Sequence, residues 1–194
     1  YGVEQNYSKA REYYEISAER NNPDALYNLG NIYYYGFGEK EDYSLAKVYY
    51  ELSAKQNNSY AIYQLGNLYY YGLGVIKDYF RAIKLYELSA KQNNSYAINK
   101  FGDLYYYGYG VEQNYSKARE YYEISAKQNN PDSFYKLSDI NKYGLGVNKS
   151  FLLNKKYISL SLINRKSARK SFFDCNFKQF LCQIGLSSVL GYCY

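Results

Sequence analysis

The chain repeats itself every 36 residues. Alanine recurs at this spacing in the series Ala10, Ala46, Ala82 and Ala118, and glycine in the series Gly36, Gly72, Gly108 and Gly144. Self-similarity of this length is typical of proteins that stack one small structural unit many times. We therefore predict four units, at residues 1–36, 37–72, 73–108 and 109–144.

Each unit contains signals for two helices. A side chain that can cap a helix N-terminus recurs at one register, as Asn6, Asp42, Asp78, Asn114 and Ser150. The first helix then carries an apolar stripe with helical spacing, which in the second unit is Ala46, Tyr49, Tyr50, Ser53 and Ala54. A pair of asparagines ends this helix and starts the second one, which stops at a Gly-x-Gly turn.

Small residues at fixed positions predict close packing between helices. Gly66 lies inside the second helix of its unit, where glycine costs about 1 kcal/mol relative to alanine. Its repeated presence therefore favours a tight helix crossing. One helix pair cannot cover its own apolar face, so we predict that the units stack into an all-α solenoid.

The segment from Asp42 to Val75 resembles the Sel1-like repeat, a TPR-like family whose units combine an alanine-containing helix, an LG-x-hydrophobic-Y stretch and a G-x-G-V turn. The resemblance extends from Tyr1 to about Phe151 and implies a right-handed α-solenoid that serves as an adaptor. Ser133, Ser138 and Asn141 depart from the pattern in the fourth unit.

Composition argues against several other functions. The chain has no histidine, which removes the commonest general base and metal ligand. Residues 1–139 hold 15 Lys and Arg against 17 Asp and Glu, whereas the rest holds 9 and 1, so a nucleic-acid groove along the repeats is not expected. Sel1-like relatives credited with β-lactam binding or turnover carry paired cysteines in every repeat, but residues 1–174 contain none. We expect no enzymatic activity, cofactor or metal.

The expected function is that of a scaffold that binds a protein or peptide partner on the concave face. A solenoid of this kind is expected to line that face with its first helices. The candidate partner-binding residues are the outward-facing positions of those helices: Arg11, Glu15, Lys47, Tyr49, Glu51, Lys84, Glu87, Arg119, Tyr121 and Glu123. The same residues also fit a solvated surface, in which Glu51, Glu87 and Glu123 pair with Lys55, Lys91 and Lys127.

A second candidate surface is the tyrosine edge of the second helices. The triplets Tyr33–Tyr35, Tyr69–Tyr71 and Tyr105–Tyr107 cannot all face one side, so the last two members of each should be partly exposed. Tyrosine is enriched at binding surfaces. Incidental exposure in a tyrosine-rich chain explains the pattern as well.

The C-terminal part differs from the repeats. Residues 145–164 are expected to form a degenerate fifth first helix, in which Asn154 and Leu162 occupy alanine positions. Residues 165–194 fit a cap, a disordered tail or the beginning of a membrane anchor with a basic flank. Contact with a membrane is therefore expected only through this segment and not through the repeats.

The chain begins within a repeat, which suggests a piece of a longer protein. It contains no signal peptide, so we expect a cytoplasmic location. An adaptor of a membrane-bound degradation or cell-wall synthesis complex, and a purely structural spacer, are the alternative functions.

Overall fold

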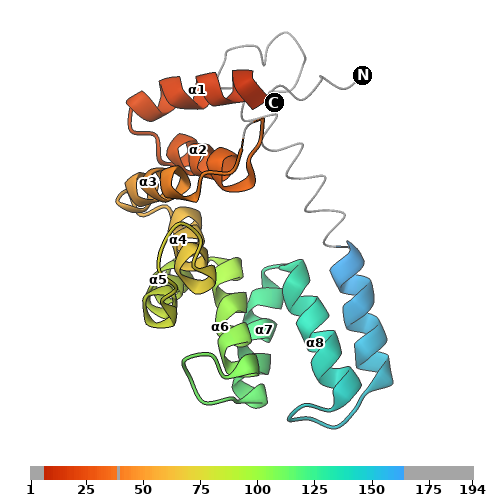
Figure 1. The fold of residues 1–194 in the computed structure, drawn as a ribbon. Coiled ribbons are helices and arrows are strands. Elements are labelled where there is room, and N and C mark those ends of the chain that lie inside the picture. Colours follow the sequence, from red (N-terminus) through yellow and green to blue (C-terminus); the bar gives the residue numbers. More distant parts are fainter. Residues whose placement is uncertain (1–6, 39, 164–194) are drawn as a thin grey trace, which may run out of the picture.

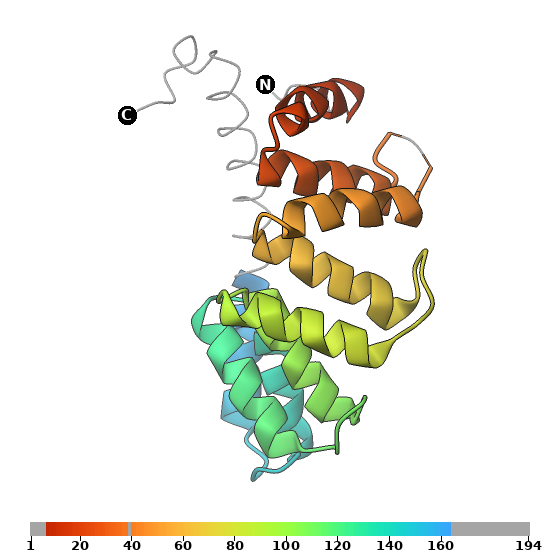
Figure 2. The ribbon, with the colours of Figure 1, turned by 90° about the vertical axis from the view of Figure 1, so that its left-hand side faces the viewer.

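The computed structural model describes residues 7–38 and 40–163, and this part of the chain consists of helices and connecting turns with no strand. The first eight helices of this part are α1 Tyr7–Glu19, α2 Pro23–Tyr35, α3 Tyr43–Ala54, α4 Ser59–Tyr71, α5 Tyr79–Lys91, α6 Ser95–Tyr107, α7 Tyr115–Lys127 and α8 Pro131–Tyr143. A further helix follows at 151–163. Successive helices form antiparallel pairs that stack in chain order (Figures 1 and 2). The expected all-α solenoid is confirmed.

The predicted capping residues begin the helices. The Asp78 carboxylate accepts a hydrogen bond from the backbone N–H of Arg81 at 2.9 Å, and Asp42 and Asn114 cap α3 and α7 in the same way. The Ser150 hydroxyl accepts one from the Leu153 N–H at 3.3 Å at the start of the helix over 151–163. These side chains satisfy N–H groups that have no partner within the helix. Asn6 lies outside the described residues.

Left-handed residues end the helices. Gly72 closes α4 with a φ of 73°, and its N–H donates to the Leu68 carbonyl. The first member of each asparagine pair has a φ near 60° (62° at Asn57), a conformation that asparagine tolerates better than most side chains. The second member, such as Asn58, then caps the next helix. Two residues thus turn the chain from one helix into the next.

The core contacts repeat from unit to unit. Tyr86 of α5 is fully buried against α4, where a Cβ added to Gly66 would lie 2.5 Å from the Tyr86 Cε1 atom. Gly30 and Gly102 have the same relation to Tyr50 and Tyr122. The glycines therefore make room for a buried ring from the next unit. The glycines are thus explained by the tyrosine ring that packs against them, and the close approach of the helix axes stays a prediction.

The fourth unit has a serine in place of the glycine that contacts the buried ring in the other units. Ser138 stands at the glycine position and is 2% exposed. The side chain of Asn154, from the helix over 151–163, donates to the Ser138 carbonyl oxygen at 3.1 Å and to its hydroxyl oxygen at 2.9 Å. Ser138 at the glycine position thus bonds to Asn154 at an alanine position, and Ile158 stands where the other units have the buried tyrosine.

The stack curves so that the even-numbered helices lie on its inner side. Figure 1 shows α3 and α5 on the outer edge, with α4 between them and the opening of the curve. Side chains of successive even helices also meet, as where the Lys136 ammonium of α8 donates to the Tyr107 hydroxyl of α6 at 2.8 Å. The expectation that the first helices line the inner side is therefore wrong. The odd helices α3, α5 and α7 each pack between the even helices that precede and follow them.

Candidate partner-binding groove

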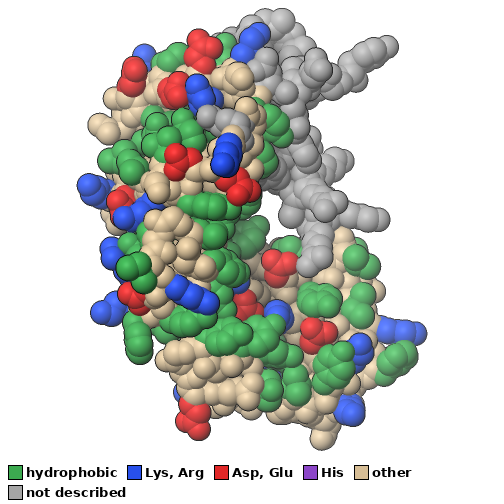
Figure 3. Space-filling view, in the orientation of Figure 1, with side chains coloured by type: hydrophobic (Ala, Val, Ile, Leu, Met, Phe, Trp, Pro, Cys, Tyr) green, Lys and Arg blue, Asp and Glu red, His purple; other side chains and the backbone are tan. Residues whose placement is uncertain are grey.

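The inner side of α4, α6 and α8 contains a cavity of about 430 Å³, which we call the inner groove. Its lining residues are Tyr63, Tyr70, Tyr71, Tyr96, Asn99, Lys100, Asp103, Tyr107, Tyr109, Asp132, Tyr135 and Lys136. Figure 3 shows acidic and basic side chains among hydrophobic ones on this side of the stack. The groove therefore joins aromatic surface with a few charged groups.

Within a tyrosine triplet, the members differ in whether they are buried in the core or exposed toward the groove. Tyr69 is buried, with the Arg81 guanidinium 4.2 Å above its ring. Tyr70 lies edge-on to Tyr71 with 4.8 Å between ring centroids, and Tyr71 is 51% exposed. The prediction that the last two members are partly exposed is confirmed for this triplet. The last members of the second and third triplets, Tyr71 and Tyr107, line the groove.

The charged centre of the groove is the carboxylate of Asp103. Its Oδ1 accepts a hydrogen bond from the buried Tyr122 hydroxyl at 2.9 Å, and its Oδ2 accepts one from the Lys100 ammonium at 3.2 Å. The Lys136 ammonium lies 3.8 Å from Oδ1. The exposed fractions of the Lys100, Lys136 and Asp103 side chains are 17%, 20% and 11%. Two ammonium groups thus share one carboxylate in a poorly solvated site.

The tyrosines and lysines of the groove have shifted pKa values. Burial raises the pKa of Tyr63 to about 12. Burial alone would lower the pKa of Lys100, but the Asp103 carboxylate and the neighbouring tyrosines raise it above its ordinary value. The hydrogen bond to Tyr107 and the Asp103 charge do the same for Lys136 against the effect of burial. Both lysines therefore remain charged near neutral pH.

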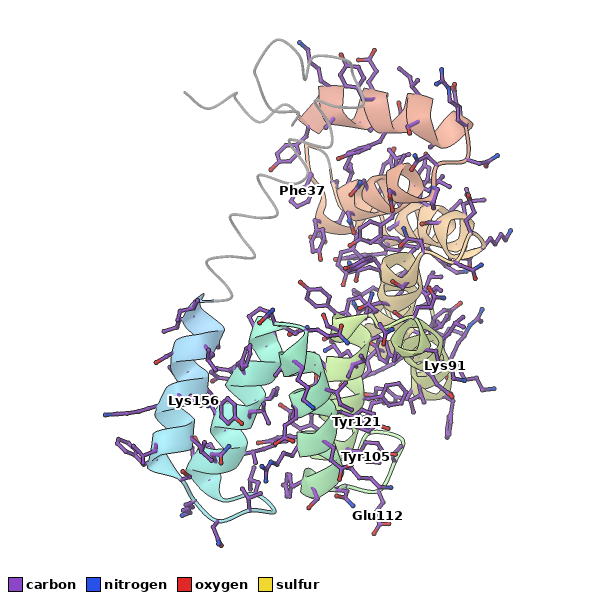
Figure 4. The ribbon with its side chains drawn as sticks, turned by 180° about the vertical axis from the view of Figure 1, so that it is seen from behind. Phe37, Lys91, Tyr105, Glu112, Tyr121 and Lys156 are labelled. Carbon is purple, nitrogen blue, oxygen red and sulfur yellow. The ribbon has the colours of Figure 1, made fainter. Side chains whose placement is uncertain are left out.

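The ten residues predicted to contact a partner lie on the odd helices, outside the groove. Figure 4 shows Lys91, on the same helix as Lys84 and Glu87, at the outer edge of the stack. Tyr121 stacks on Tyr105 with 5.7 Å between ring centroids, and Tyr49 stacks on Tyr33 in the same way at 5.5 Å. The structure therefore places the ten residues on the odd helices α1, α3, α5 and α7. Their contact with a partner stays a prediction.

The ion pairs of the outer side differ in part from the predicted ones. Lys91 pairs with Glu87 at 3.0 Å, as expected. Glu51 instead pairs with Lys47 at 3.5 Å, and Glu123 with Arg119 at 2.8 Å. Glu51 and Glu123 each have a basic residue four positions away in both directions, so spacing alone could not choose between them.

The outer side also carries a row of aliphatic side chains that the sequence reasoning missed. Its four members are between 39% and 48% exposed: Ile16, Leu52, Leu88 and Ile124. Each follows one of the predicted glutamates directly, and the 36-residue spacing was the signal that could have revealed them.

Neither a metal site nor a membrane span is evident in the part of the chain that the structure describes. Residues 7–38 and 40–163 contain no group of three or more Cys, Asp or Glu side chains arranged to hold a metal ion. No helix in the same ranges is long and apolar enough to cross a bilayer. The expected cap, tail or anchor at 165–194 lies outside the described residues.

A family model matches most of the chain. The model described as Sel1 repeat matches residues 1–22, 23–58, 59–94 and 95–130. The last three of these matches have the predicted length of 36 residues and begin at an even helix, whereas the predicted units begin before an odd one; the first match is shorter and contains α1.

Solved structures share the fold. A Sel1 repeat protein from Oxalobacter formigenes is 29% identical with a TM-score of 0.73, covering 86% of this chain and 67% of its own. A protective antigen of uropathogenic Escherichia coli that displays an SLR fold is also 29% identical, with a TM-score of 0.68 over 92% of this chain and 38% of its own.

A curated relative is similar over a shorter stretch. It is the ERAD-associated E3 ubiquitin-protein ligase component HRD3B of Arabidopsis thaliana, which is 51% identical over 41 residues. The match covers 21% of this chain and 7% of the relative. It therefore concerns about one repeat and not the whole relative.

Proposed function

Because the chain belongs to the Sel1 repeat family, we propose that it is a scaffold that binds an extended segment of a partner protein in the inner groove. Sel1 repeat proteins are generally scaffolds for protein–protein interaction. The observation that supports this site is the groove itself, a concave surface with exposed tyrosines on rigid helices and charged groups at its centre. Such tyrosines offer large contact area at low entropic cost, and charged groups add specificity.

The outer side is the alternative binding face, because the odd helices carry both the ten predicted residues and the aliphatic row. The groove is favoured because it is concave and an extended segment in it would be contacted from several helices at once. A flat row of separate aliphatic side chains offers less enclosure. Both faces can be tested in one experiment.

The test compares two variants of the chain for binding to a partner first captured with the unaltered chain and then purified. The inner variant is Tyr96→Arg with Tyr135→Arg, since both side chains are exposed and line the groove. The outer variant reverses charge at Lys47, Glu51, Lys84 and Glu87. Circular dichroism and thermal melting serve as controls for folding.

We expect the inner variant to weaken binding by about tenfold or more, as loss of about 1.4 kcal/mol implies. The outer variant should bind within about twofold of the unaltered chain. The opposite result would assign binding to the ten outer residues and refute the groove.

A role in a degradation or cell-wall synthesis complex is a narrower hypothesis. The relative in Arabidopsis thaliana is by name a component of an ERAD-associated ubiquitin ligase, and the chain matches 7% of it. The identity of the captured partner tests this hypothesis, which fails if that partner belongs to neither kind of complex.

A further inference from the structure

The helix over 151–163 exposes large apolar side chains on one side. Leu152 is 80% exposed and Ile163 is 59% exposed. The two residues are about three helical turns apart, so they lie on the same side of the helix. At the same register α7 has Ser116 and Lys127. This helix therefore presents apolar groups at positions that are polar in α7.

A further repeat stacked on this end would leave both side chains exposed. The odd helices α3, α5 and α7 each pack between two even helices. Even so, the residues at the register of Leu152 stay exposed in all three of them: Ser44, Phe80 and Ser116. The residues at the register of Ile163 are exposed as well: Lys55, Lys91 and Lys127. The exposure of Leu152 and Ile163 therefore does not result from the position of their helix after α8.

Two lysines flank these apolar side chains. Lys155 and Lys156 lie three and four residues after Leu152, so they are on the same side of the helix as Leu152 and Ile163. Both are exposed, and the Lys155 ammonium lies 4.7 Å from the centroid of the Phe151 ring. Figure 4 shows Lys156 on this helix at the end of the stack. We call Leu152, Lys155, Lys156 and Ile163 the lipid stripe.

Carboxylates do not neutralise this end of the stack. Residues 144–163 contain three Lys and no Asp or Glu, and the next ten residues of the sequence add four Lys and Arg, again without Asp or Glu. The neighbouring helices α7 and α8 together hold five Lys and Arg against four Asp and Glu. In the part of the chain that the structure describes, no carboxylate forms an ion pair with Lys149, Lys155 or Lys156. The positive charge is thus available to an anionic partner.

We propose that the lipid stripe docks the stack on the surface of a bilayer that contains anionic phospholipids. Leu152 and Ile163 would enter the boundary between headgroups and acyl chains, while Lys155 and Lys156 would reach the phosphate groups beside them. A bilayer surface accepts apolar and cationic groups from one side of a helix and requires no pocket. The inference is independent of the proposed function, because the inner groove is lined by other residues.

The test measures the binding of the full chain to vesicles by co-sedimentation. One set of vesicles consists of phosphatidylcholine alone, and the other of phosphatidylcholine and phosphatidylserine in equal amounts. We expect binding to the anionic vesicles, weakened by added salt, and little binding to phosphatidylcholine alone.

Two variants separate the charged and the apolar contributions. Lys155→Gln with Lys156→Gln should weaken binding to the anionic vesicles by about tenfold or more, because each lysine near the surface contributes about fivefold. Leu152→Ser with Ile163→Ser should weaken it by a similar factor, because the apolar area that enters the bilayer is lost. All four positions are exposed, so circular dichroism and thermal melting should show an unchanged fold.

The chain offers a matched control for charge. Lys55→Gln with Lys91→Gln removes the same charge at exposed positions near the ends of α3 and α5, and should bind the anionic vesicles within about twofold of the unaltered chain. A loss as large as that of the lysine variant of the stripe would overturn the inference, because net charge and not this helix would then cause binding.

Two further outcomes would refute the lipid stripe. The first is a full chain that does not bind the anionic vesicles. The second is binding that neither stripe variant weakens, which would assign it to other residues such as those at 165–194. None of these outcomes bears on the inner groove, which is tested by partner binding.

Discussion

Single buried tyrosines join each unit to the next. Tyr50, Tyr86 and Tyr122 are fully buried, and their hydroxyls donate to residues 19 positions earlier, Asn31, Asn67 and Asp103. The apolar stripe of the first helices predicted the burial of these rings. It could not predict the partners, because the spacing of apolar residues along one helix does not show which residues of the neighbouring helix they meet.

Removal of one of these hydroxyls should lower the free energy of unfolding more where the hydrogen-bond acceptor is charged. Tyr122→Phe removes a donor to a carboxylate and should lower the free energy of unfolding by about 1.5–3 kcal/mol. Tyr86→Phe removes a donor to a neutral amide and should cost about 1 kcal/mol. Urea unfolding followed by circular dichroism measures both. Equal losses would show that the charge of Asp103 does not strengthen the bond.

The glycines that contact these rings should not tolerate a larger side chain. Gly66→Ala places a methyl group 2.5 Å from the Tyr86 ring, and overpacking of this kind costs about 1–3 kcal/mol. Alanine recovers about 1 kcal/mol through its better helix propensity. We therefore expect a net loss in the original chain and no loss in a Tyr86→Leu background, measured as a double-mutant cycle of thermal melts. The same loss in both backgrounds would refute the contact as the cause.

Helix ends were the part of the fold that could be predicted best. Caps such as Asp78 and Gly72 are local, since their hydrogen bonds reach only a few residues along the chain. The side of the curve on which a helix lies is not local. Helices α3 and α4 both have a buried and a polar face, so periodicity alone could not show which one lines the groove.

The asparagine turn between α5 and α6 should depend on its left-handed residue. Asn93 has a φ of 59°, which β-branched side chains avoid at a cost of about 1–2 kcal/mol. Asn93→Val should lower the melting temperature, whereas Asn93→Gly should leave it nearly unchanged. Gln92→Val, at a neighbouring φ of −92°, is the matched control. A loss of similar size in the control would assign the effect to the side chain and not to the backbone.

The stack as a whole combines a predictable core with a groove that was only partly foreseen. The repeat period predicted the solenoid, and tyrosine exposure predicted that the edge of the even helices reaches the surface. Lys100 and Lys136 were not singled out, because lysine at a surface position is common. Only the 36-residue alignment of Asn28, Gln64, Lys100 and Lys136 could have marked them.

The many buried tyrosines make the stack sensitive to alkaline pH. Burial raises the pKa of Tyr27, Tyr34 and Tyr63 to about 12, above the ordinary value of 10.0. A folded-state pKa above the unfolded one stabilises the fold below pH 10, and this contribution disappears as the pH rises to about 12. The urea midpoint should fall across that range, together with a rise in tyrosinate absorbance. An unchanged midpoint would contradict the burial of these hydroxyls.

The turn that links an odd helix to the next even one has a genetic consequence. The octapeptide KQNNSYAI occurs identically at 55–62 and 91–98, with the same left-handed asparagine and the same cap in both places. Recombination between the two copies would remove or duplicate one whole repeat without creating a new junction. The length of the groove can therefore change in steps of one unit, and a shortened form that lacks α4 and α5 would keep Lys100, Asp103 and Lys136 together.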